Sequence, residues 1–318
     1  MHSFVLAITT YNRIAYLKDC IESWLKTRSD SNAWVLIVAD DGSVDGSLEY
    51  IENLSLHNTE VVVIKNKRIG VHQQVNTIIK KLEELDYDFC FKVDDDIFFK
   101  EKGWDLAYFS TAMNTGFHHL VFCDENWCAE QFLEQPKRKA ELVGRLDYLN
   151  VHGFFYTISP QVIRRVGYFD IENFGFRGMG HVDYTVRCAR AGFTDLQTPW
   201  DIKESNKYLT TSKKDYRSAL PSVQIAAYDE MNRKRKEKVI QDINRLYIAF
   251  QKINERIFTD FKNELIEALS YKVEKFEAEN EEMKAWYVNE LHKTQEWYQK
   301  KLNKLPTWYV SIGNKFFK

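Results

Sequence analysis

The chain has 318 residues, enough for one large domain or two of ordinary size. Its composition, 44% hydrophobic and 14% aromatic, excludes a largely disordered protein. The formal net charge of -2 gives no reason to expect a polyanionic partner such as nucleic acid. No apolar run in the sequence approaches the roughly 20 residues that a membrane-spanning helix needs.

The first residues and the cysteines indicate the compartment. "MHSFVLAITTYNR" has a short apolar run without a basic leader, which predicts a first strand rather than a signal peptide. The five cysteines are scattered and odd in number, and Cys123 and Cys128 lack companions at the spacing of a zinc site. We therefore expect reduced thiols and a cytoplasmic protein.

Apolar runs alternate with amphipathic segments between residues 4 and 93. Four runs predict buried strands: "FVLAIT", "AWVLIVA", "EVVVIK" and "YDFCFKV". Between them, three segments have the spacing of helices with one apolar face: residues 14–27, 47–54 and 71–84. This alternation predicts an α/β domain with a mostly parallel, Rossmann-like sheet flanked by helices.

In such a sheet, ligands bind beyond the carboxyl ends of the strands. Polar residues follow three of the predicted strands: Thr9–Tyr11, Asp40–Asp41 and Asp94–Asp96. We expect these three groups to meet at one edge of the sheet.

The pattern of the chain changes near residue 220. Twelve of the 13 glycines lie at or before Gly192, and no proline occurs between Pro221 and Pro306. We therefore expect one domain of α/β type over residues 1–222 and an all-α region over residues 223–318.

Within the all-α region, one set of apolar residues alternates steps of four and three: Val239, Ile243, Leu246, Phe250, Ile253 and Ile257. This pattern favours a coiled coil or helical bundle that joins copies of the chain, or helices that pack on each other or on the first domain. The final stretch, "WYQKKLNKLPTWYVSIGNKFFK", mixes aromatic residues with lysines. It suits a peripheral contact with the inner face of the plasma membrane, and equally an aromatic cluster docked on the protein.

Three consecutive aspartates, Asp94, Asp95 and Asp96, follow the fourth predicted strand in "FKVDDDIFF". A solvated turn is one explanation. The other is a divalent cation, Mg²⁺ or Mn²⁺, which takes carboxylate oxygens together with substrate phosphates and water. Their place at a strand end favours the cation, which would neutralise the repulsion and stabilise a departing diphosphate.

Over roughly residues 3–200 the chain resembles the family 2 glycosyltransferases of the GT-A fold. The resembling segments are "AITTYNR", "VLIVADDGSVDGS", "NKRIGVHQQVN", "KVDDDIFF" and "HGFFYTISPQVIRRVGYFD" followed by "GMGHVDYTVRCARAG". The resemblance implies an inverting, metal-dependent hexosyl- or N-acetylhexosaminyl-transferase. Its donor would be a nucleotide-sugar, most simply a UDP-sugar, and its acceptor a glycan or lipid-linked hydroxyl.

The resemblance also implies a site for the donor nucleotide at the strand ends. Thr9 and Tyr11 would line the base, and Asp41 would accept a hydrogen bond from it. For Asp40 and Asp41, an N-cap or an Asx turn before the next helix is the alternative. Arg68 lies where a basic side chain could reach phosphate or base, and an ordinary surface arginine is the alternative.

In the acidic triplet, Asp94 and Asp96 match the two outer positions of the family's Asp-x-Asp element and would hold the metal, with Asp96 the stronger ligand. In a frame shifted by one residue, Asp95 would contact the ribose and Asp96 the metal.

Asp183, in "GHVDYTVRCARAG", occupies the place that the resemblance gives to the catalytic aspartate. It would take the proton of the acceptor hydroxyl as that oxygen attacks the anomeric carbon. A helix that begins there would favour the ionised carboxylate, and N-capping is the alternative role. The family usually has Glu before this aspartate, but this chain has Val182, so the contact with the acceptor is missing or is replaced by His181.

Residues 124–150 lack clean periodicity, and we expect a mobile loop or an acceptor wall there. Trp127 would stack on a sugar or simply pack. His152 and Gly153 precede an apolar run on the acceptor side. The glycine allows either close approach of a substrate or a strand bulge.

Two other functions compete with sugar transfer. A metal-dependent phosphohydrolase would need further Asp or His ligands on neighbouring strand ends, which the sequence does not indicate. An inactive scaffold that acts through its helical C-terminus is opposed by the joint presence of Asp41, Asp96 and Asp183.

Overall fold

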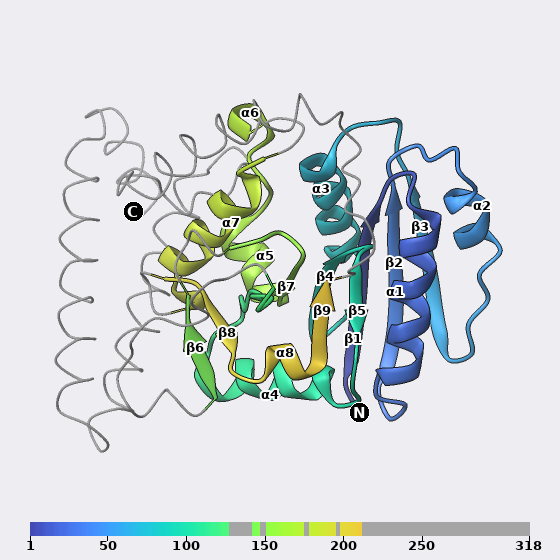
Figure 1. The fold of residues 1–318 in the computed structure, drawn as a ribbon. Helices are drawn as coiled ribbons and strands as arrows, with labels where there is room; N and C mark the ends of the chain where they lie inside the picture. The colour runs from blue at the N-terminus through green and yellow to red at the C-terminus, as the bar shows by residue number, and fades with distance from the viewer. Residues whose placement is uncertain (127–141, 147–150, 175–177, 195–197, 212–318) are drawn as a thin grey trace, which may run out of the picture. The chain divides into compact units, whose positions relative to one another are not determined.

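The computed structural model describes residues 1–126, 142–146, 151–174, 178–194 and 198–211 (Figure 1). A five-stranded sheet in the order β3-β2-β1-β4-β7 forms its centre. The strands are β1 (Ser3–Thr10), β2 (Ala33–Asp40), β3 (Thr59–Lys65), β4 (Phe89–Asp94) and β7 (Phe155–Ile158). The first four are parallel, and β7 pairs antiparallel with β4. The predicted α/β fold with a mostly parallel sheet is confirmed.

The three helices expected between these strands are present. They are α1 (Ile14–Thr27), α2 (Ser47–Glu52) and α3 (Val71–Leu82). Both α2 and α3 end two residues before the predicted limit, within the usual uncertainty of helix ends. On α1, Leu17, Ile21 and Trp24 are buried as the spacing predicted.

After β4 the described chain continues through shorter elements. These are β5 (Ile97–Phe99), α4 (Trp104–Thr115), β6 (Val143–Arg145), α5 (Pro160–Val166), α6 (Ile171–Phe174), α7 (Gly180–Cys188), the π-helix η3 (Ala189–Phe193), β8 (Trp200–Ile202), α8 (Ser205–Tyr208) and β9 (Leu209–Thr211). Two small antiparallel sheets pair β5 with β9 and β6 with β8. The antiparallel β7 brings the residues that precede it to the same edge as the carboxyl ends of β1 and β4.

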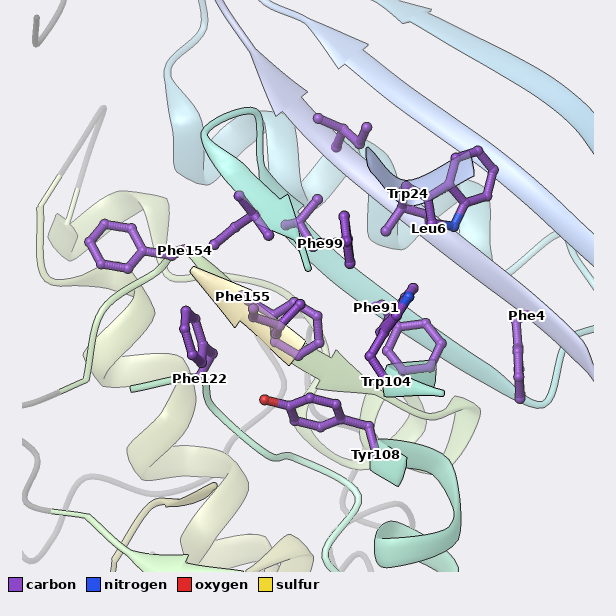
Figure 2. Close-up of a cluster of buried hydrophobic side chains, with 14 of the residues drawn as sticks. Phe4, Leu6, Trp24, Phe91, Phe99, Trp104, Tyr108, Phe122, Phe154 and Phe155 are labelled. Atoms are coloured by element: carbon purple, nitrogen blue, oxygen red, sulfur yellow. The ribbon is translucent and has the colours of Figure 1, made fainter. Parts of the chain in front are cut away.

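An aromatic cluster covers one face of the sheet (Figure 2). Alternate strand residues enter it, among them Phe4 of β1 and Phe91 of β4, as the two-residue repeat of a strand requires. The ring of Trp104, the first residue of α4, lies 4.8 Å from that of Phe91 and 4.5 Å from that of Phe99, centroid to centroid. Because each aromatic side chain buries a large area, about 150–250 Å², the cluster holds β4, β5 and α4 firmly together.

The cysteines only partly follow the sequence prediction. Cys20, Cys90 and Cys188 are buried free thiols, as expected. Cys123, however, is disulfide-bonded, so the expectation of reduced thiols is wrong for this residue. Cysteine spacing tests for a zinc site and does not indicate which thiols form a disulfide.

In the described parts of the chain, no helix has both the length and the apolar character needed to cross a bilayer. Several predictions fall on residues outside the described ranges: the boundary at residue 222, the all-α region over residues 223–318 with its heptad pattern, and the aromatic, lysine-rich C-terminal stretch.

A buried histidine generates a prediction about stability and pH. His119 is fully buried, its Nδ1–H donates to the Thr157 carbonyl oxygen at 3.0 Å, and its Nε2 lies 3.1 Å from the Thr185 hydroxyl. Burial lowers the pKa of His119 from 6.5 to about 4. Between these two values the unfolded chain binds a proton that the folded protein does not, so stability must fall as the pH falls.

The contribution of His119 is about 3 kcal/mol between pH 7 and pH 4. His119→Asn retains a donor toward Thr157 but does not titrate in this range, so the variant should lose less stability on acidification than the wild type. Urea unfolding of both proteins at pH 7.0 and pH 4.5 measures the difference. Equal losses for the two proteins would contradict the assignment.

Candidate active site

The structure brings the predicted strand ends together. Thr9 of β1 pairs in register with Asp94 of β4, and Thr10 pairs with Asp40 of β2. The Thr9 hydroxyl donates to Asp94 Oδ1 at 2.9 Å, and the Thr10 hydroxyl donates to Asp95 Oδ2 at 2.7 Å. The end of β1 thus binds the acidic triplet directly.

The acidic triplet forms the tight connection between β4 and β5, and it is not a solvated turn. Asp95 and Asp96 are 2% and 3% exposed, whereas Asp94 is partly exposed. Arg13, the residue before α1, donates from Nη2 to Asp96 Oδ2 at 2.6 Å, and its Nε lies 3.3 Å from Asp95 Oδ1. Lys92 of β4 forms an ion pair with Asp94.

Burial dominates the electrostatics of the triplet. It raises the pKa of Asp95 to about 8, although the positive charge of Arg13 acts in the opposite direction. The pKa of Asp96 is also raised, first by burial and then, against the effect of Arg13, by the neighbouring charge of Asp94. Among the described atoms, Asp96 Oδ1 is buried without a hydrogen-bond partner. The turn therefore gathers carboxyl groups whose ionised form the protein compensates incompletely.

Asp41 joins the end of β2 to the start of α3. Its fully buried carboxylate accepts hydrogen bonds from the backbone N–H groups of Ile69 at 2.6 Å and Gly70 at 2.9 Å. It also accepts one from Arg68 Nη1 at 2.8 Å. A carboxylate in this position lies at the positive end of the α3 dipole. The Arg68 guanidinium lies over the ring of Tyr11, 3.6 Å from its centroid, so Arg68 is a positioned side chain and not an ordinary surface arginine.

Asp40 makes the Asx turn that was the alternative to a ligand role. Its Oδ1 accepts hydrogen bonds from the backbone N–H groups of Gly42 and Ser43, both at 2.9 Å. Its Oδ2 is buried, with no hydrogen-bond partner among the described residues.

Asp183 lies in the first turn of α7, as expected, but its side chain is fully buried. Its Oδ2 accepts a hydrogen bond from Arg187 Nε at 2.9 Å. The Arg187 guanidinium also donates to the carbonyl oxygens of Val166 at 3.0 Å and Tyr168 at 2.9 Å. The carboxylate is thus part of a buried ion pair, and its assignment as the general base stays a prediction.

His181 and Gly153 contact each other on the acceptor side. A Cβ at position 153 would lie 3.4 Å from the His181 ring, an ordinary van der Waals distance, so the two residues are neighbours. His181 Nε2 lies 3.2 Å from the Val151 carbonyl oxygen, which can only accept, so this nitrogen carries the proton. The Gly153 carbonyl accepts from Lys92 Nζ at 3.3 Å, which connects this group to the acidic turn.

The other two acceptor-side candidates differ. His152 stacks on Phe154 with ring centroids 5.0 Å apart. Trp127 lies outside the described residues.

Three residues that make close contacts at or beside the candidate site were not predicted from the sequence. Arg13 ends the quoted "TTYNR" segment, and Lys92 interrupts an apolar strand, which was a usable signal because a buried lysine needs a partner. His72 gave no signal. It packs against the start of α7 so closely that a Cβ at position 180 would lie 2.6 Å from its Nε2.

Residues 5–121 match the family model described as Glycosyl transferase family 2. The match begins within β1, continues past the end of α4 and includes Asp41 and Asp96. Over these residues the chain is similar to the family 2 glycosyltransferases. Asp183 lies beyond the matched residues.

A relative and two solved structures agree with this assignment. "Uncharacterized glycosyltransferase R363" of Acanthamoeba polyphaga mimivirus is 29% identical over 218 residues, which are 64% of this chain and 79% of the relative. S. aureus TarS 1-349, solved in complex with UDP-GlcNAc, has a TM-score of 0.50 at 16% identity. The match covers 94% of this chain and 92% of the TarS chain. GalNAc-T7, solved with UDP, GalNAc and Mn2+, has a TM-score of 0.53 at 12% identity. The match covers 83% of this chain and 55% of the GalNAc-T7 chain. The two solved structures confirm the predicted GT-A fold.

The contact between His72 and Gly180 generates a prediction about stability. Gly180→Ala would force the new methyl group onto the imidazole of His72, which is 2% exposed and stacks on Phe169 at 5.8 Å. We expect a loss of about 1–3 kcal/mol in stability, as for other overpacked sites. In the His72→Ala background the same change should cost far less. A double-mutant cycle from urea unfolding measures this coupling, and strictly additive losses would show that the two residues do not clash.

Proposed function

We propose that the glycosyltransferase moves a hexose or N-acetylhexosamine, with inversion, from a nucleotide-sugar to a hydroxyl of a glycan or lipid-linked acceptor. The donor in this proposal is a UDP-sugar. The observation that carries the proposal is the buried acidic turn, where Asp95 and Asp96 are withheld from water and one oxygen of Asp96 has no hydrogen-bond partner among the described atoms. TarS and GalNAc-T7, which share the fold, were solved with UDP-GlcNAc and with UDP and Mn2+, respectively.

The residues of the turn fit a divalent cation, Mn²⁺ or Mg²⁺. In the described part of the chain, no cluster of three Asp, Glu, His or Cys side chains is arranged to hold a metal ion. Such ions, however, commonly bind one or two carboxylates and leave their other positions to substrate phosphates and water. Asp96 offers its unpaired oxygen, and Asp94 is the second candidate ligand. When bound, the ion would stabilise the negative charge of the leaving diphosphate.

The nucleotide base is proposed to lie near Tyr11 and Arg68. Their stacked arrangement presents an aromatic ring and a cation together at the strand ends. Asp41 accepts hydrogen bonds from three donors of the protein, so it supports this wall by fixing Arg68 and the start of α3. A contact between Asp41 and the base remains part of the proposal, because Oδ1 accepts one hydrogen bond among the described residues, from Ile69, and has a second lone pair.

In the proposed transfer, the acceptor oxygen bonds to the anomeric carbon while the bond from that carbon to the diphosphate breaks. The electron pair of the broken bond leaves with the diphosphate, and the proton of the acceptor passes to the general base. The resemblance predicts Asp183 for this role. Arg187 holds Oδ2 of this carboxylate and the side chain is fully buried, so Asp183 must become accessible to the acceptor hydroxyl before it can take the proton.

The alternative functions receive less support. A phosphohydrolase with two metal ions would need more ligands than the described residues gather at the turn. An inactive scaffold would have no use for carboxylates that are costly to bury. Self-association through residues 223–318, contact of the C-terminus with a membrane, and a cytoplasmic location remain predictions from the sequence.

Asp96→Asn tests the donor site. Loss of the charge should weaken binding of UDP in the presence of Mn²⁺ by about tenfold or more, because a charge-assisted contact is lost. Turnover of UDP-GlcNAc, followed by UDP release, should fall at least as much. The matched control is Asp30→Asn, whose side chain is 82% exposed, and it should behave as wild type. Calorimetry that finds unchanged manganese-dependent UDP binding in Asp96→Asn would reject this donor site.

Asp183→Asn tests the general base. The amide keeps an oxygen that can accept from Arg187, but it cannot take a proton, so UDP affinity should stay near the wild-type value while turnover falls about 100-fold or more. Calorimetry and steady-state kinetics on the folded variant measure the two quantities.

Near wild-type turnover of Asp183→Asn would remove Asp183 from the mechanism. His181→Asn is the paired variant, because His181 adjoins the turn through Gly153 and Lys92.

A further inference from the structure

Arg13 makes a long-range ion pair across the candidate site. It directly precedes α1, yet its guanidinium reaches the β4–β5 connection, 83 residues further along the chain. Nη2 donates to Asp96 Oδ2 at 2.6 Å, and Nε lies 3.3 Å from Asp95 Oδ1. The Arg13 side chain is 26% exposed, whereas both carboxylates are 2% exposed, so the arginine has access to solvent and its partners do not.

Among the described residues, two cationic side chains form ion pairs with the acidic triplet. Lys92 compensates Asp94, and Arg13 compensates Asp95 and Asp96. Without Arg13, two adjacent carboxylates would be buried with the Thr10 hydroxyl as their one side-chain donor among the described residues. Such an arrangement is strongly unfavourable, because buried like charges repel each other and lose their hydration.

The Arg13 contact also uses the carboxylate that a divalent ion needs. Asp96 gives Oδ2 to Arg13, while its Oδ1 is buried without a hydrogen-bond partner among the described atoms. Arg13 Nε is near Asp95 but is not aligned for a hydrogen bond. A guanidinium and a metal ion on the same carboxylate repel each other and compete for the same negative charge. Binding of the metal therefore weakens the hold of Asp96 on Arg13.

A guanidinium released from Asp96 would have a suitable new partner close by. Its planar fork of donors matches phosphate oxygens as well as it matches a carboxylate. The ring of Tyr16, 4.8 Å from Arg13 Cζ, supports the guanidinium from within α1.

We propose that Arg13 is an exchangeable counter-ion of the acidic turn. It neutralises Asp95 and Asp96 before the donor arrives, and it moves from Asp96 to the diphosphate of the nucleotide-sugar when the divalent ion binds. The inference rests on the proposed function, since it requires a metal and a diphosphate at this turn. It assigns Arg13 two effects of opposite sign: Arg13 opposes binding of the metal alone and favours binding of the nucleotide.

Calorimetry on the full chain tests this proposal without measuring activity. Wild type, Arg13→Met, Arg13→Lys and the control Lys18→Met are titrated with MnCl₂ alone, and then with UDP at saturating Mn²⁺. Lys18 is an exposed residue of α1, and its ammonium lies 5.1 Å from the centroid of the Tyr50 ring. It therefore matches Arg13 in charge and in its contact with an aromatic ring.

Arg13→Met should bind Mn²⁺ alone about threefold more tightly or better, because its competitor is gone. It should bind UDP about tenfold more weakly, because a charge-assisted contact with phosphate is gone. Arg13→Lys should recover part of the UDP affinity, and Lys18→Met should leave both affinities unchanged.

A fall in both affinities of Arg13→Met would show a purely structural role and overturn the proposal, as would two unchanged affinities. If Arg13→Met does not fold, the same opposite shifts, smaller in size, are required of Arg13→Lys. A wild type that binds neither Mn²⁺ nor UDP would reject the proposed function, and the inference with it. A failure confined to the Arg13 variants rejects the inference alone.

Discussion

Negative charge buried at the end of a central strand sets the requirements for this site. A carboxylate that leaves water loses several kcal/mol of hydration, which must be recovered from nearby charges and hydrogen bonds. Here the recovery comes from Arg13, Lys92 and the hydroxyl groups of Thr9 and Thr10. These groups reach the turn only if β1 and β4 keep their register and α1 begins directly after β1. The charge and the topology are therefore interdependent.

The apolar half of the domain makes this arrangement rigid. The two-residue repeat of β4 sends Phe91 into the aromatic cluster and places Lys92 and Asp94 together on the opposite face. Trp104 packs on both Phe91 and Phe99, so the strands on either side of the acidic turn are anchored to one helix. A turn held in this way cannot easily move its carboxylates apart to relieve their repulsion, and a cation is the remaining means of relief.

The proposed donor and acceptor sides differ in whether their carboxylates are already held by other groups of the protein. On the donor side, polar groups already point at one another, and one carboxylate oxygen is without a hydrogen-bond partner among the described atoms. On the acceptor side, Asp183 is held by Arg187, whose other donors bind the carbonyl oxygens of Val166 and Tyr168. The proposed catalysis by Asp183 therefore requires local rearrangement at the start of α7. His181 lies nearby, where its Nε2 donates to the Val151 carbonyl oxygen.

The sequence by itself determined the elements and their order. The four strands and three helices were predictable because continuous apolar runs and one-sided apolar spacing are local properties of the chain. The meeting of Thr9, Asp41 and Asp96 was predictable too, because the ends of parallel strands share one edge. Only the tertiary structure decided how these groups are compensated. Arg13 and Asp96 are 83 residues apart, and Arg187 is held by carbonyl oxygens of α5 and of the segment after it, so neither contact leaves a local pattern. A charge is compensated by the groups that surround it in space, and those are known only once the chain has folded.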